Sequence, residues 1–564
     1  MGHYSEVIRR HRHLAIIPLA ALLAVVPLLL RGTSCGHDLG FHLHNWLEVS
    51  SQWKQGWLLP HWDFTAAWNS GEPRFVFYPP ISWTMGALLG LFLPWAAVPT
   101  TYIWIALTLC GFGMYRLARV WATSINALIP ATLYMVHPYM LFTFSERAAY
   151  AELLAAAWVP LLLLAVLKQR LSAPCFALPI ALLWLTDAPA AIMSCYAVAL
   201  LAPVRIFFTW RTAQGFSNAF RDVAQILSGI LLGFGMAAFY LIPAAVERRW
   251  VHINMSVEGD RLQDNYLFGL GGSPTHVAIL RTASLCGVCL LILCAIFLLA
   301  ALSSREPLKS TSVGSNFHKR ALVALALLAC SILFLLTAPS AVVWDHLPGL
   351  KALQFPWRLC AILGAIAMAL LALAMRRTHR LPAAVILTSL VAPFALSVAG
   401  NVLFRQFCQT DNSTSSLITN FYTGARLDSF DQYTPVFSDP TALGHYNPTF
   451  WMADTPTATP LPTAVQDYTV ELAHRLHFQI FTPVPKFFIT NLRSYPAWKA
   501  TVNGIPVAPI RHRNDGLFTL PIPRGKSTID FTYVHTRDQT AGWLISALAT
   551  LCIIFSMGKH QQEP

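Results

Sequence analysis

Carboxylate and imidazole side chains collect directly after the first apolar run of this sequence. The stretch GHDLGFHLHNW places His37, Asp38, His42 and His44 there. A carboxylate in such a position can orient or deprotonate an acceptor hydroxyl, and a neutral imidazole can do the same or bind a metal ion. The simpler alternative is a set of polar loop residues bonded to backbone. A divalent metal on His37, Asp38 and His42 stays an open question at this point.

A second stretch, FTFSERAAYAELL, carries Glu146, Arg147 and Glu152 where another apolar run begins. Acidic residues are favoured at a helix N-terminus by the helix dipole, so capping is the simplest role for Glu146 and an alternative one for Glu152. If these carboxylates faced Asp38 instead, they would supply an acid and a base. The sequence leaves both roles open.

A third stretch, WDHLPGLKALQFPWRLC, carries Lys351, Trp357 and Arg358 before a further apolar run. An arginine can clamp a phosphate through two parallel hydrogen bonds, or it can snorkel to lipid headgroups as an anchor. Trp357 fits the aromatic belt of a membrane interface. Asp187 lies inside an apolar run, where a carboxylate is costly in lipid, so it either faces the bundle interior or ends a helix.

The segments that must position these residues are of membrane length. The chain has 564 residues, of which 55% are hydrophobic and 12% charged, whereas an ordinary soluble domain has about 25% charged residues. Apolar runs of about 17 to 25 residues recur from Leu14 onward, each long enough to cross a bilayer as a helix. This composition excludes a soluble enzyme. The net charge of +13 is spread over short segments between the runs, which indicates membrane topology and not nucleic-acid binding.

Basic residues between the runs predict the orientation. Placing the basic N-terminus in the cytoplasm makes the first run an uncleaved helix and puts the segment from Gly32 outside. If residues 81–97 also crossed the membrane, Arg116 and Arg119 would fall outside, so we expect this segment to lie in the outer interface. The prediction is a polytopic α-helical membrane protein of about twelve transmembrane helices with both ends in the cytoplasm.

The predicted organisation has three parts. Residues 1–399 form a transmembrane domain with outer loops at 32–99, 143–152, 247–276 and 338–358. Residues 400–540 form a periplasmic loop-rich and β-sandwich-like module, because turn signals such as Asn503-Gly504 and Arg524-Gly525 separate short alternating strands there. Residues 541–564 hold the last transmembrane helix and a cytoplasmic tail. The 11 cysteines show no zinc pattern and no disulfide framework.

The order of the motifs resembles a known family. GHDLGFHLHNW, PHW, GEPRFVFYPP, PYMLFTFSERAAYAE, LPGLKALQFPWR and SYPAWKATVNG follow one another in this chain. That order resembles the bacterial membrane proteins called 6-pyruvoyl-tetrahydropterin-synthase-related, which are similar to the glycosyltransferase C (GT-C) superfamily. The resemblance covers nearly the whole chain and is most specific in the first loop, through its HD element and the YPP element at Tyr78. It implies no pterin chemistry.

The resemblance implies a GT-C-type glycosyltransferase of the bacterial inner membrane with its active face periplasmic. Asp38 would be the base of the first loop, and Glu152, or else Glu146, the second acidic residue. The residues that would bind substrates are His37, His42, Tyr78, Arg147, Lys351, Trp357 and Arg358.

The implied donor is a sugar linked to a polyprenyl phosphate, with membrane lipids around it. The acceptor would be an unknown glycan, lipid or protein; no cofactor is certain, and a divalent metal is left open. The rival interpretation is a non-enzymatic membrane protein, either a lipid or polysaccharide transporter or an assembly scaffold. A transporter needs polar residues along several spans, yet these spans are nearly free of charge apart from Asp187, which favours the enzyme.

Overall fold

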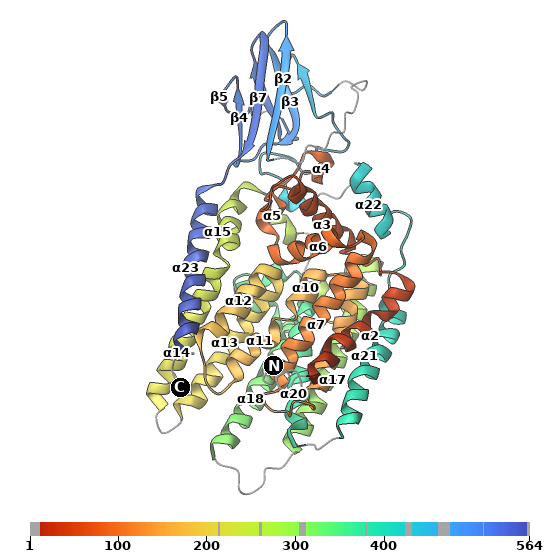
Figure 1. Cartoon of the computed structure of the whole chain (residues 1–564), viewed down its shortest axis with the longest axis vertical. Helices are drawn as coiled ribbons and strands as arrows, with labels where there is room; N and C mark the ends of the chain where they lie inside the picture. The colour runs from red at the N-terminus through yellow and green to blue at the C-terminus, as the bar shows by residue number, and fades with distance from the viewer. Residues whose placement is uncertain are drawn as a thin grey trace, which may run out of the picture.

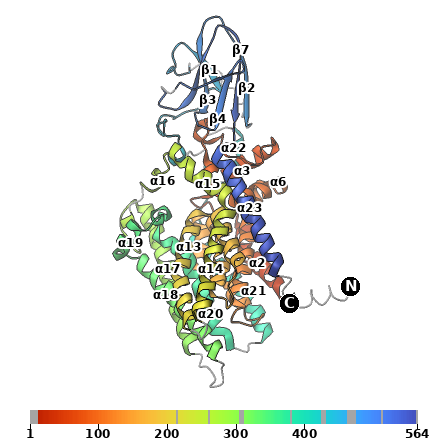
Figure 2. The ribbon, with the colours of Figure 1, turned by 90° about the vertical axis from the view of Figure 1, so that its left-hand side faces the viewer.

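The computed structural model describes residues 12–211, 215–258, 262–303, 312–377, 381–423, 431–460, 474–510 and 513–560. A long helical bundle carries a small β-structured module at one end (Figures 1 and 2). Ten of the described helices are long and apolar enough to cross a membrane. The chain is therefore a multi-pass α-helical membrane protein, as predicted. The basic N-terminal stretch, residues 259–261 of the predicted loop 247–276, and the end of the predicted cytoplasmic tail lie outside the described residues.

Long helices alternate with short ones along the chain. The candidate spans contain α2 (Ile16–Arg31), α7 (Val98–Ala118), α10 (Tyr150–Ala155) with α11 (Val159–Leu167), α13 (Ala188–Trp210), α14 (Gly215–Met236), α17 (Pro274–Ser303), α18 (Ser312–Leu335), α20 (Cys360–Ala374), α21 (Pro382–Phe404) and α23 (Arg537–His560). The shorter helices are α3 (Leu39–Lys54), α4 (Ala66–Asn69), α5 (Arg74–Phe77), α6 (Pro80–Phe92), α8 (Leu128–Tyr134), α9 (Pro138–Phe142), α12 (Ala173–Thr186), α15 (Ala238–Glu247), α16 (Met255–Glu258), α19 (Ala341–His346) and α22 (Thr414–Thr423).

The sequence predicts about twelve spans, and short helices account for the difference from ten. The 14-residue helix α12 packs against α11, α13 and α14 inside the bundle. The pair α8 and α9, which is interrupted before Pro138, packs against α7, α20 and α21. Length and composition alone do not count such short or broken helices as spans, although they belong to the bundle.

Helix α6 belongs to the layer formed by the first loop. It has 13 residues, ends at Leu93 before Pro94, and packs against α3 and α7. The next candidate span begins only at Trp95. Figure 1 shows α3, α5 and α6 together at the end of the bundle next to the β-strands, which we call the loop end (residues 32–92). The interfacial position expected for residues 81–97 stays a prediction.

The β-module is built from two antiparallel sheets, with strand orders β1-β3-β6 and β2-β7-β4-β5. The strands are β1 (Phe450–Ala453), β2 (Arg475–Thr482), β3 (Lys486–Arg493), β4 (Trp498–Val502), β5 (Ile505–Val507), β6 (Leu517–Ile522) and β7 (Gly525–Tyr533). The predicted Asn503-Gly504 turn joins β4 to β5, and both residues have the positive φ angles, 54° and 77°, that such tight turns require.

One hydrophobic core joins the β-module to the loop end. Phe488 of β3, Phe518 of β6 and Phe531 of β7 pack between the two sheets. Trp57 and Trp62 of the first loop belong to the same buried cluster. The module is therefore seated on the first loop by shared packing, in addition to its connection to α23.

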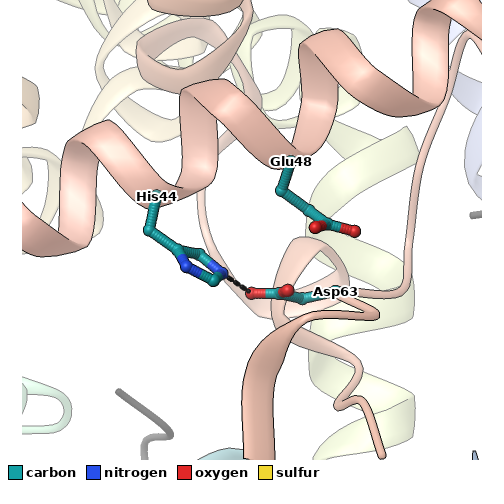
Figure 3. Close-up of side chains that lie close together, drawn as sticks. All are labelled: His44, Glu48 and Asp63. Carbon is teal, nitrogen blue, oxygen red and sulfur yellow. Dashed lines mark hydrogen bonds and ion pairs between the residues drawn. The ribbon is translucent and has the colours of Figure 1, made fainter. Parts of the chain in front are cut away.

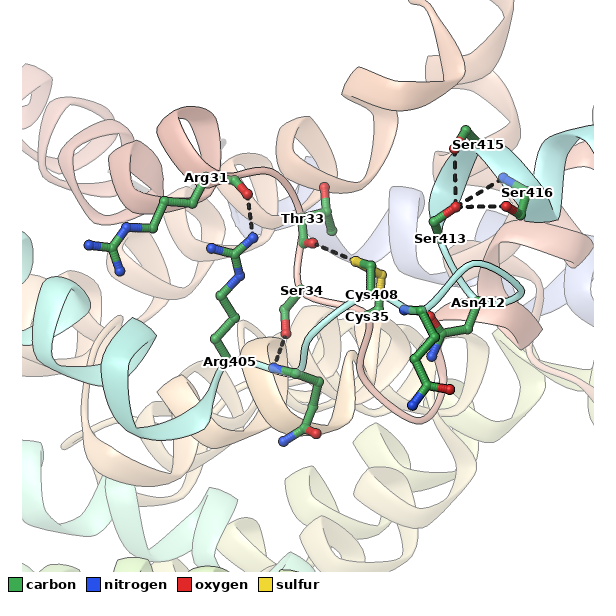
Figure 4. Close-up of a disulfide and its surroundings, with 12 residues drawn as sticks. Arg31, Thr33, Ser34, Cys35, Arg405, Cys408, Asn412, Ser413, Ser415 and Ser416 are labelled. Carbon is green, nitrogen blue, oxygen red and sulfur yellow. Dashed lines mark hydrogen bonds between the residues drawn. A yellow bond between two sulfur atoms is a disulfide. The ribbon is translucent and has the colours of Figure 1, made fainter.

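A disulfide joins Cys35 to Cys408 across 373 residues of sequence (Figure 4). The prediction of no disulfide framework is wrong at this point. The partners become neighbours only because α21 packs along α2, and no local spacing in the sequence shows that pairing. Around the disulfide, Arg405 donates to the carbonyl of Arg31, and the Gln406 N–H donates to Ser34 Oγ at 2.9 Å. The start of the first loop is thus tied to the segment after α21.

Candidate functional site

The backbone around Asp38 lies against the segment that carries Glu146 and Arg147. The Asp38 N–H donates to the carbonyl of Arg147 at 2.7 Å, and the His37 N–H donates to that of Glu146 at 3.4 Å. Gly36 makes this approach feasible, because a Cβ there would lie 2.6 Å from the Glu146 carbonyl oxygen. Residues about 110 positions apart are therefore held together by main-chain contacts.

Arg147 and Glu152 are positioned by an irregular stretch between two helices. Residues Thr143–Arg147 form a π-helical turn, Ala148 then takes a left-handed conformation with φ 54°, and α10 begins at Tyr150. Such turns are frequent at functional sites because they redirect side chains. Here the turn aims Arg147 back at the first turn of α10, so that Arg147 Nη1 lies 2.5 Å from Glu152 Oε2.

Four charged side chains form what we call the arginine cluster: Asp38, Arg147, Glu152 and Arg358. Arg147 Nη2 lies 3.8 Å from Asp38 Oδ2, and Arg358 Nε lies 3.8 Å from Glu152 Oε2. Glu152 is buried and also accepts a 2.5 Å hydrogen bond from the Tyr139 hydroxyl. The Asp38 side chain is 43% exposed. The cluster thus combines a carboxylate enclosed by cations with one that a substrate can reach.

Arg358 is the cation with free donor capacity. It lies in the 3₁₀ turn Pro356–Leu359 that leads into α20, and its side chain is only 13% exposed. Its Nε is buried and has no hydrogen-bond partner in the described part of the chain, and the same is true of the neighbouring Trp357 Nε1. The Trp357 ring lies under Arg147, 4.8 Å from its guanidinium carbon. The guanidinium of Arg358, largely buried and with a free N–H among the described residues, is suited to bind an anionic ligand.

Asp187 is a further acidic residue of this region. It lies between α12 and α13 and caps α13 by accepting a 2.9 Å hydrogen bond from the Ala190 N–H. Burial raises the pKa of Asp187 to about 6, helped by the charge of Glu152 and opposed by that of Arg358. From the sequence, Asp187 is only an acidic residue within an apolar run. Its position near Glu152 and Arg358 depends on how α12 and α13 pack.

Of the other predicted site residues, His42 and Tyr78 lie close to Asp38. His42 is buried behind Asp38, where its Nε2 accepts from the Tyr150 N–H at 3.1 Å and burial lowers its pKa to about 4. Tyr78 packs edge-on against Phe41, with ring centroids 4.8 Å apart. His42 therefore lies in the first turn of α3, directly after Asp38, and Tyr78 packs against the same helix.

Glu146 and Lys351 lie outside the arginine cluster. Glu146 is half-buried beside His37 and Gln406, and burial raises its pKa. Lys351 pairs with Asp345 at 3.1 Å, and both side chains are more than half exposed. The structure therefore gives neither residue a contact with Glu152 or Arg358.

A possible metal set lies elsewhere in the first loop. Among the described residues, the group of three metal-ligating side chains is His44, Glu48 and Asp63, whose ligand atoms all lie within 4.8 Å of one another (Figure 3). The set His37, Asp38 and His42 forms no such group in the described chain.

The His44, Glu48 and Asp63 group does not fit a metal ion. An ion would have to sit about 2.0 to 2.2 Å from each ligand atom. The Thr65 hydroxyl already lies among them, 2.7 Å from Glu48, 3.2 Å from Asp63 and 3.3 Å from His44. Arg74 Nη1 also lies 2.9 Å from Asp63 Oδ2. Most of the donors and acceptors satisfy one another, as in a structural hydrogen-bond network, although His44 Nδ1 and Glu72 Oε2 are buried without a hydrogen-bond partner in the described chain.

We call this set the buried network: His44, Glu48, Asp63, Glu72 and Arg74. Burial disfavours ionisation of Asp63, but Arg74 and His44 outweigh it and lower the pKa of Asp63 to about 2. Burial and the nearby Asp63 charge raise the pKa of Glu48 to about 7. Glu48 therefore keeps its proton to a higher pH than an exposed glutamate does, and the network fixes α3 to residues 63–74.

Comparison with known proteins yields one set of similar structures. No protein-family model matches this sequence, and no curated protein matches it. The arabinofuranosyltransferase AftD from Mycobacteria is similar in structure, with a TM-score of 0.40 and 17% identity over 70% of this chain and 27% of AftD. A variant of AftD gives a TM-score of 0.41 and 18% identity over 70% of this chain and 28% of that one.

The chain spans about a quarter of the length of AftD, 27% in the first comparison. What the structure itself defines is the class: a multi-pass helical membrane protein with a β-module and a charged cluster at one end of the bundle. The relation to 6-pyruvoyl-tetrahydropterin-synthase-related proteins stays a prediction, because none of these similar structures concerns it.

Proposed function

We propose that this protein is a GT-C-type glycosyltransferase that moves a sugar from a polyprenyl-phosphate-linked donor to an extracytoplasmic acceptor. The observation that carries the proposal is the arginine cluster. A reachable carboxylate, Asp38, lies beside Arg147, which shares Glu152 with Arg358, and the buried Nε of Arg358 has no hydrogen-bond acceptor in the described chain. Transfer from a phosphate needs both a base and a cation for the leaving group.

The geometry divides the work among the four residues. Asp38 accepts the proton of the acceptor hydroxyl as its oxygen attacks the anomeric carbon. The bond from that carbon to the phosphate oxygen breaks, and the polyprenyl phosphate leaves with its negative charge next to Arg358. This single displacement inverts the anomeric configuration.

Glu152 takes a positioning role in this proposal, although the resemblance gives it as a second catalytic acid. Its two oxygens already bind Arg147 and Tyr139, and Arg358 stands 3.8 Å away. A carboxylate enclosed in this way has no free face for a substrate. It holds the two guanidinium groups at the spacing that an incoming phosphate needs, and Arg147 links it to Asp38.

The disulfide supports an extracytoplasmic active face. Cys35 lies three positions before Asp38, and structural disulfides persist in oxidising compartments. Arg119, Lys168 and Arg211 directly follow α7, α11 and α13, which run away from the loop end, as the positive-inside rule requires for a cytoplasmic side. In our proposal the arginine cluster faces the periplasmic side of a bacterial inner membrane, where lipid-linked sugars serve as donors.

Native mass spectrometry of the detergent-purified protein tests the donor site directly. We expect a polyprenyl phosphate, or its glycosylated form, to co-purify with the wild type and to be lost in Arg358→Ala. Lys351→Ala is the matched control, because it also removes a cation from the stretch before α20 but outside the cluster. If all three proteins carry only bulk phospholipid, the donor assignment is wrong.

A further inference from the structure

Asp187 is the acidic residue of this region to which the proposed function gives no role. It ends α12, which packs against α6 of the loop end and against α10, the helix of Glu152. Asp187 Oδ2 caps α13 by accepting from the Ala190 N–H at 2.9 Å. No described residue donates to its Oδ1, and the residue is partly exposed. One oxygen of this carboxyl group is therefore available to a ligand.

Asp187 lies near both ends of the arginine cluster. The charge of Arg358 acts on Asp187. Burial raises the pKa of Tyr78, and the charges of Asp187 and Asp38 raise it further, so Tyr78 lies near both carboxyl groups. Asp187 and Asp38 therefore border the same region of the site, with Arg358 near Asp187.

The ionisable side chains that interact electrostatically with Asp187 come from six elements around it. They are Arg147 of the π-helical turn, Glu152 of α10, Arg358 before α20, Tyr78 after α5, Tyr102 of α7 and Tyr240 of α15. Helices α6 and α11, which also pack against α12, carry no ionisable side chain. The protonation of Asp187 thus depends on its burial and on the groups of the site itself.

A charge count shows what a bound phosphate requires. Asp38, Glu152 and Asp187 supply three carboxyl groups against the two guanidinium groups of Arg147 and Arg358. A phosphodiester at Arg358 adds a negative charge, and the phosphate monoester that leaves is more negative still. Like charges held close together oppose ionisation, so one carboxyl group has to carry a proton when the phosphate is bound.

Asp187 is the carboxyl group placed to carry that proton. Glu152 is held as a carboxylate by Arg147 at 2.5 Å, and Asp38 has to be ionised to act as the base. Asp187 keeps a free oxygen near Arg358. Burial raises the pKa of Asp187 to about 6, with the charge of Glu152 in support and that of Arg358 opposed. A general acid works best when its pKa lies near the operating pH.

We propose that Asp187 is the general acid of this site and that its Oδ1 donates a proton to the phosphate that leaves at Arg358. The inference rests on the proposed function, since it adds a catalytic residue to the same reaction. The acceptor oxygen bonds the anomeric carbon as its proton passes to Asp38. The bond from that carbon to the phosphate oxygen breaks, its electron pair stays on that oxygen, and the oxygen takes the proton of Asp187. Exchange with water then returns a proton to Asp187 and removes one from Asp38.

Binding of farnesyl phosphate tests this proton without a sugar donor or an acceptor. The full-length protein in lipid nanodiscs is titrated with the probe by calorimetry at pH 6 and pH 8. In Asp187→Asn the amide oxygen can still cap α13 and the amide nitrogen can donate to the phosphate without a titratable proton. We expect the Kd of the wild type to rise about tenfold more over this range than that of Asp187→Asn, because Asp187 loses its proton above about pH 6.

Ionisation of the probe affects both proteins alike. So do Glu48 and Glu247, whose pKa values are raised to about 7 and which are unchanged in the variant. Asp345→Asn is the matched control, because it removes an exposed carboxylate outside the cluster, and it should show the pH dependence of the wild type. Equal pH dependence of Kd in the wild type and in Asp187→Asn would overturn the inference.

Release of polyprenyl phosphate from the co-purified lipid-linked sugar gives the catalytic readout. Asp187→Asn should lower release about 10²-fold at pH 6 and less than about tenfold at pH 8, where the wild type has lost the acidic proton. Asp187→Ser, which also keeps a cap for α13, should behave in the same way. A loss of equal size at both pH values would mean that Asp187 only holds α13 or binds the sugar, and the inference would be wrong.

Arg358→Ala and Asp38→Asn separate this inference from the proposed function. If Arg358→Ala binds farnesyl phosphate as tightly as the wild type, or if Asp38→Asn releases the lipid phosphate as fast, the proposed function fails. If both variants show the expected losses while Asp187→Asn keeps the pH dependence of the wild type, only the role of Asp187 is refuted.

Discussion

Two charged groups of the loop end, the buried network and the arginine cluster, contain similar residues but are built differently. In the buried network Asp63 is held by His44, Arg74, Thr65 and the Ala66 N–H, and Glu72 takes two contacts from Arg74. In the arginine cluster Asp38 is 43% exposed and its nearest cation is 3.8 Å away. Buried charges that are held from several sides stabilise a fold, whereas an exposed carboxylate is available to a ligand.

The difference shows where to look for function in a region rich in charge. Three carboxylates of the buried network form the denser group, yet Thr65 and Arg74 already occupy the space between them. The arginine cluster is sparser, and its Arg358 Nε has no hydrogen-bond partner in the described chain. Variants that break each group should therefore have opposite consequences, with activity lost in one case and stability in the other.

The largest expected effect is the loss of sugar transfer in the Asp38→Asn variant. Removing the base should lower the release of polyprenyl phosphate from lipid-linked sugar about 10³-fold, while the thermal unfolding midpoint stays at the wild-type value. Release can be followed by mass spectrometry of lipids in nanodiscs. Asp345→Asn, at an exposed carboxylate outside the cluster, is the control and should retain full activity. Undiminished release in Asp38→Asn would remove the enzyme assignment.

The next largest effect is on stability in Arg74→Met. Arg74 is fully buried between Asp63 and Glu72, and removing one partner of a buried ion pair leaves uncompensated charge at a cost of about 3 to 5 kcal/mol. We expect little folded protein in the membrane and a strongly lowered unfolding midpoint. Lys351→Met removes an exposed pair with Asp345, for which a change of about 0 to 1 kcal/mol is expected. Equal stability of the two variants would contradict the structural role of the buried network.

How much of this was predictable from sequence differs between the two groups. Asp38, Arg147, Glu152 and Arg358 were all predicted as site residues, because ionisable side chains next to apolar runs are conspicuous. Their assembly was not predictable, since it depends on the π-helical turn at Thr143–Arg147 and on contacts between distant segments. The roles assigned to them remain predictions.

The buried network and the disulfide were missed for a related reason. PHW and GEPRFVFYPP contributed to the family resemblance, but no role was predicted for Asp63 or Arg74, because only the folded path brings them to the helix that carries His44 and Glu48. Residues 67–69 adopt three consecutive positive φ angles on that path, which Ala67 and Trp68 would not suggest. By contrast, the membrane class and the β-module follow from composition and turn signals, which are local properties.

A smaller effect on the free energy of unfolding is expected from a change in pH. This effect should come from Glu48 and not from Asp63, although both belong to the buried network. The pKa of Glu48 is raised from 4.5 to about 7, so the folded protein binds this proton more tightly than the unfolded chain does. Stability should therefore fall as pH rises from about 5 to 8, by roughly 2 to 3 kcal/mol from this group. The lowered pKa of Asp63, about 2, has no influence in that window.

Glu48→Gln should flatten this dependence, because a glutamine can still accept from the Phe64 N–H and bond Thr65. Unfolding midpoints at pH 5, 6.5 and 8 give the slope. Part of the slope should remain, since burial also raises the pKa of Glu247 to about 7 where α15 meets Tyr495 and Gln539. A Glu48→Gln slope equal to that of the wild type would mean that Glu48 is already ionised in the folded protein.

The smallest effect is expected from Cys35→Ser combined with Cys408→Ser. The disulfide tethers the arginine cluster to α21, but main-chain bonds from Cys35 to Gln406 and from Asp38 to Arg147 hold the same segment. The loss of stability should therefore be about 1 to 2 kcal/mol, at the lower end for disulfides, with transfer reduced less than about threefold. A larger loss of transfer would show that Asp38 depends on the tether for its position.

The same cysteines report which side of the membrane the arginine cluster faces. In intact cells a membrane-impermeant maleimide should label Cys35 and Cys408 only after reduction, because the folded protein holds them in the disulfide. Cys175 is exposed near Lys168 at the opposite end of the bundle, so it should react only after the membrane is permeabilised. Labelling of Cys175 in intact cells, with Cys35 still unlabelled after reduction, would mean that the orientation is the opposite one. The arginine cluster would then face the compartment that holds nucleotide sugars, and the lipid-linked donor would lose its rationale.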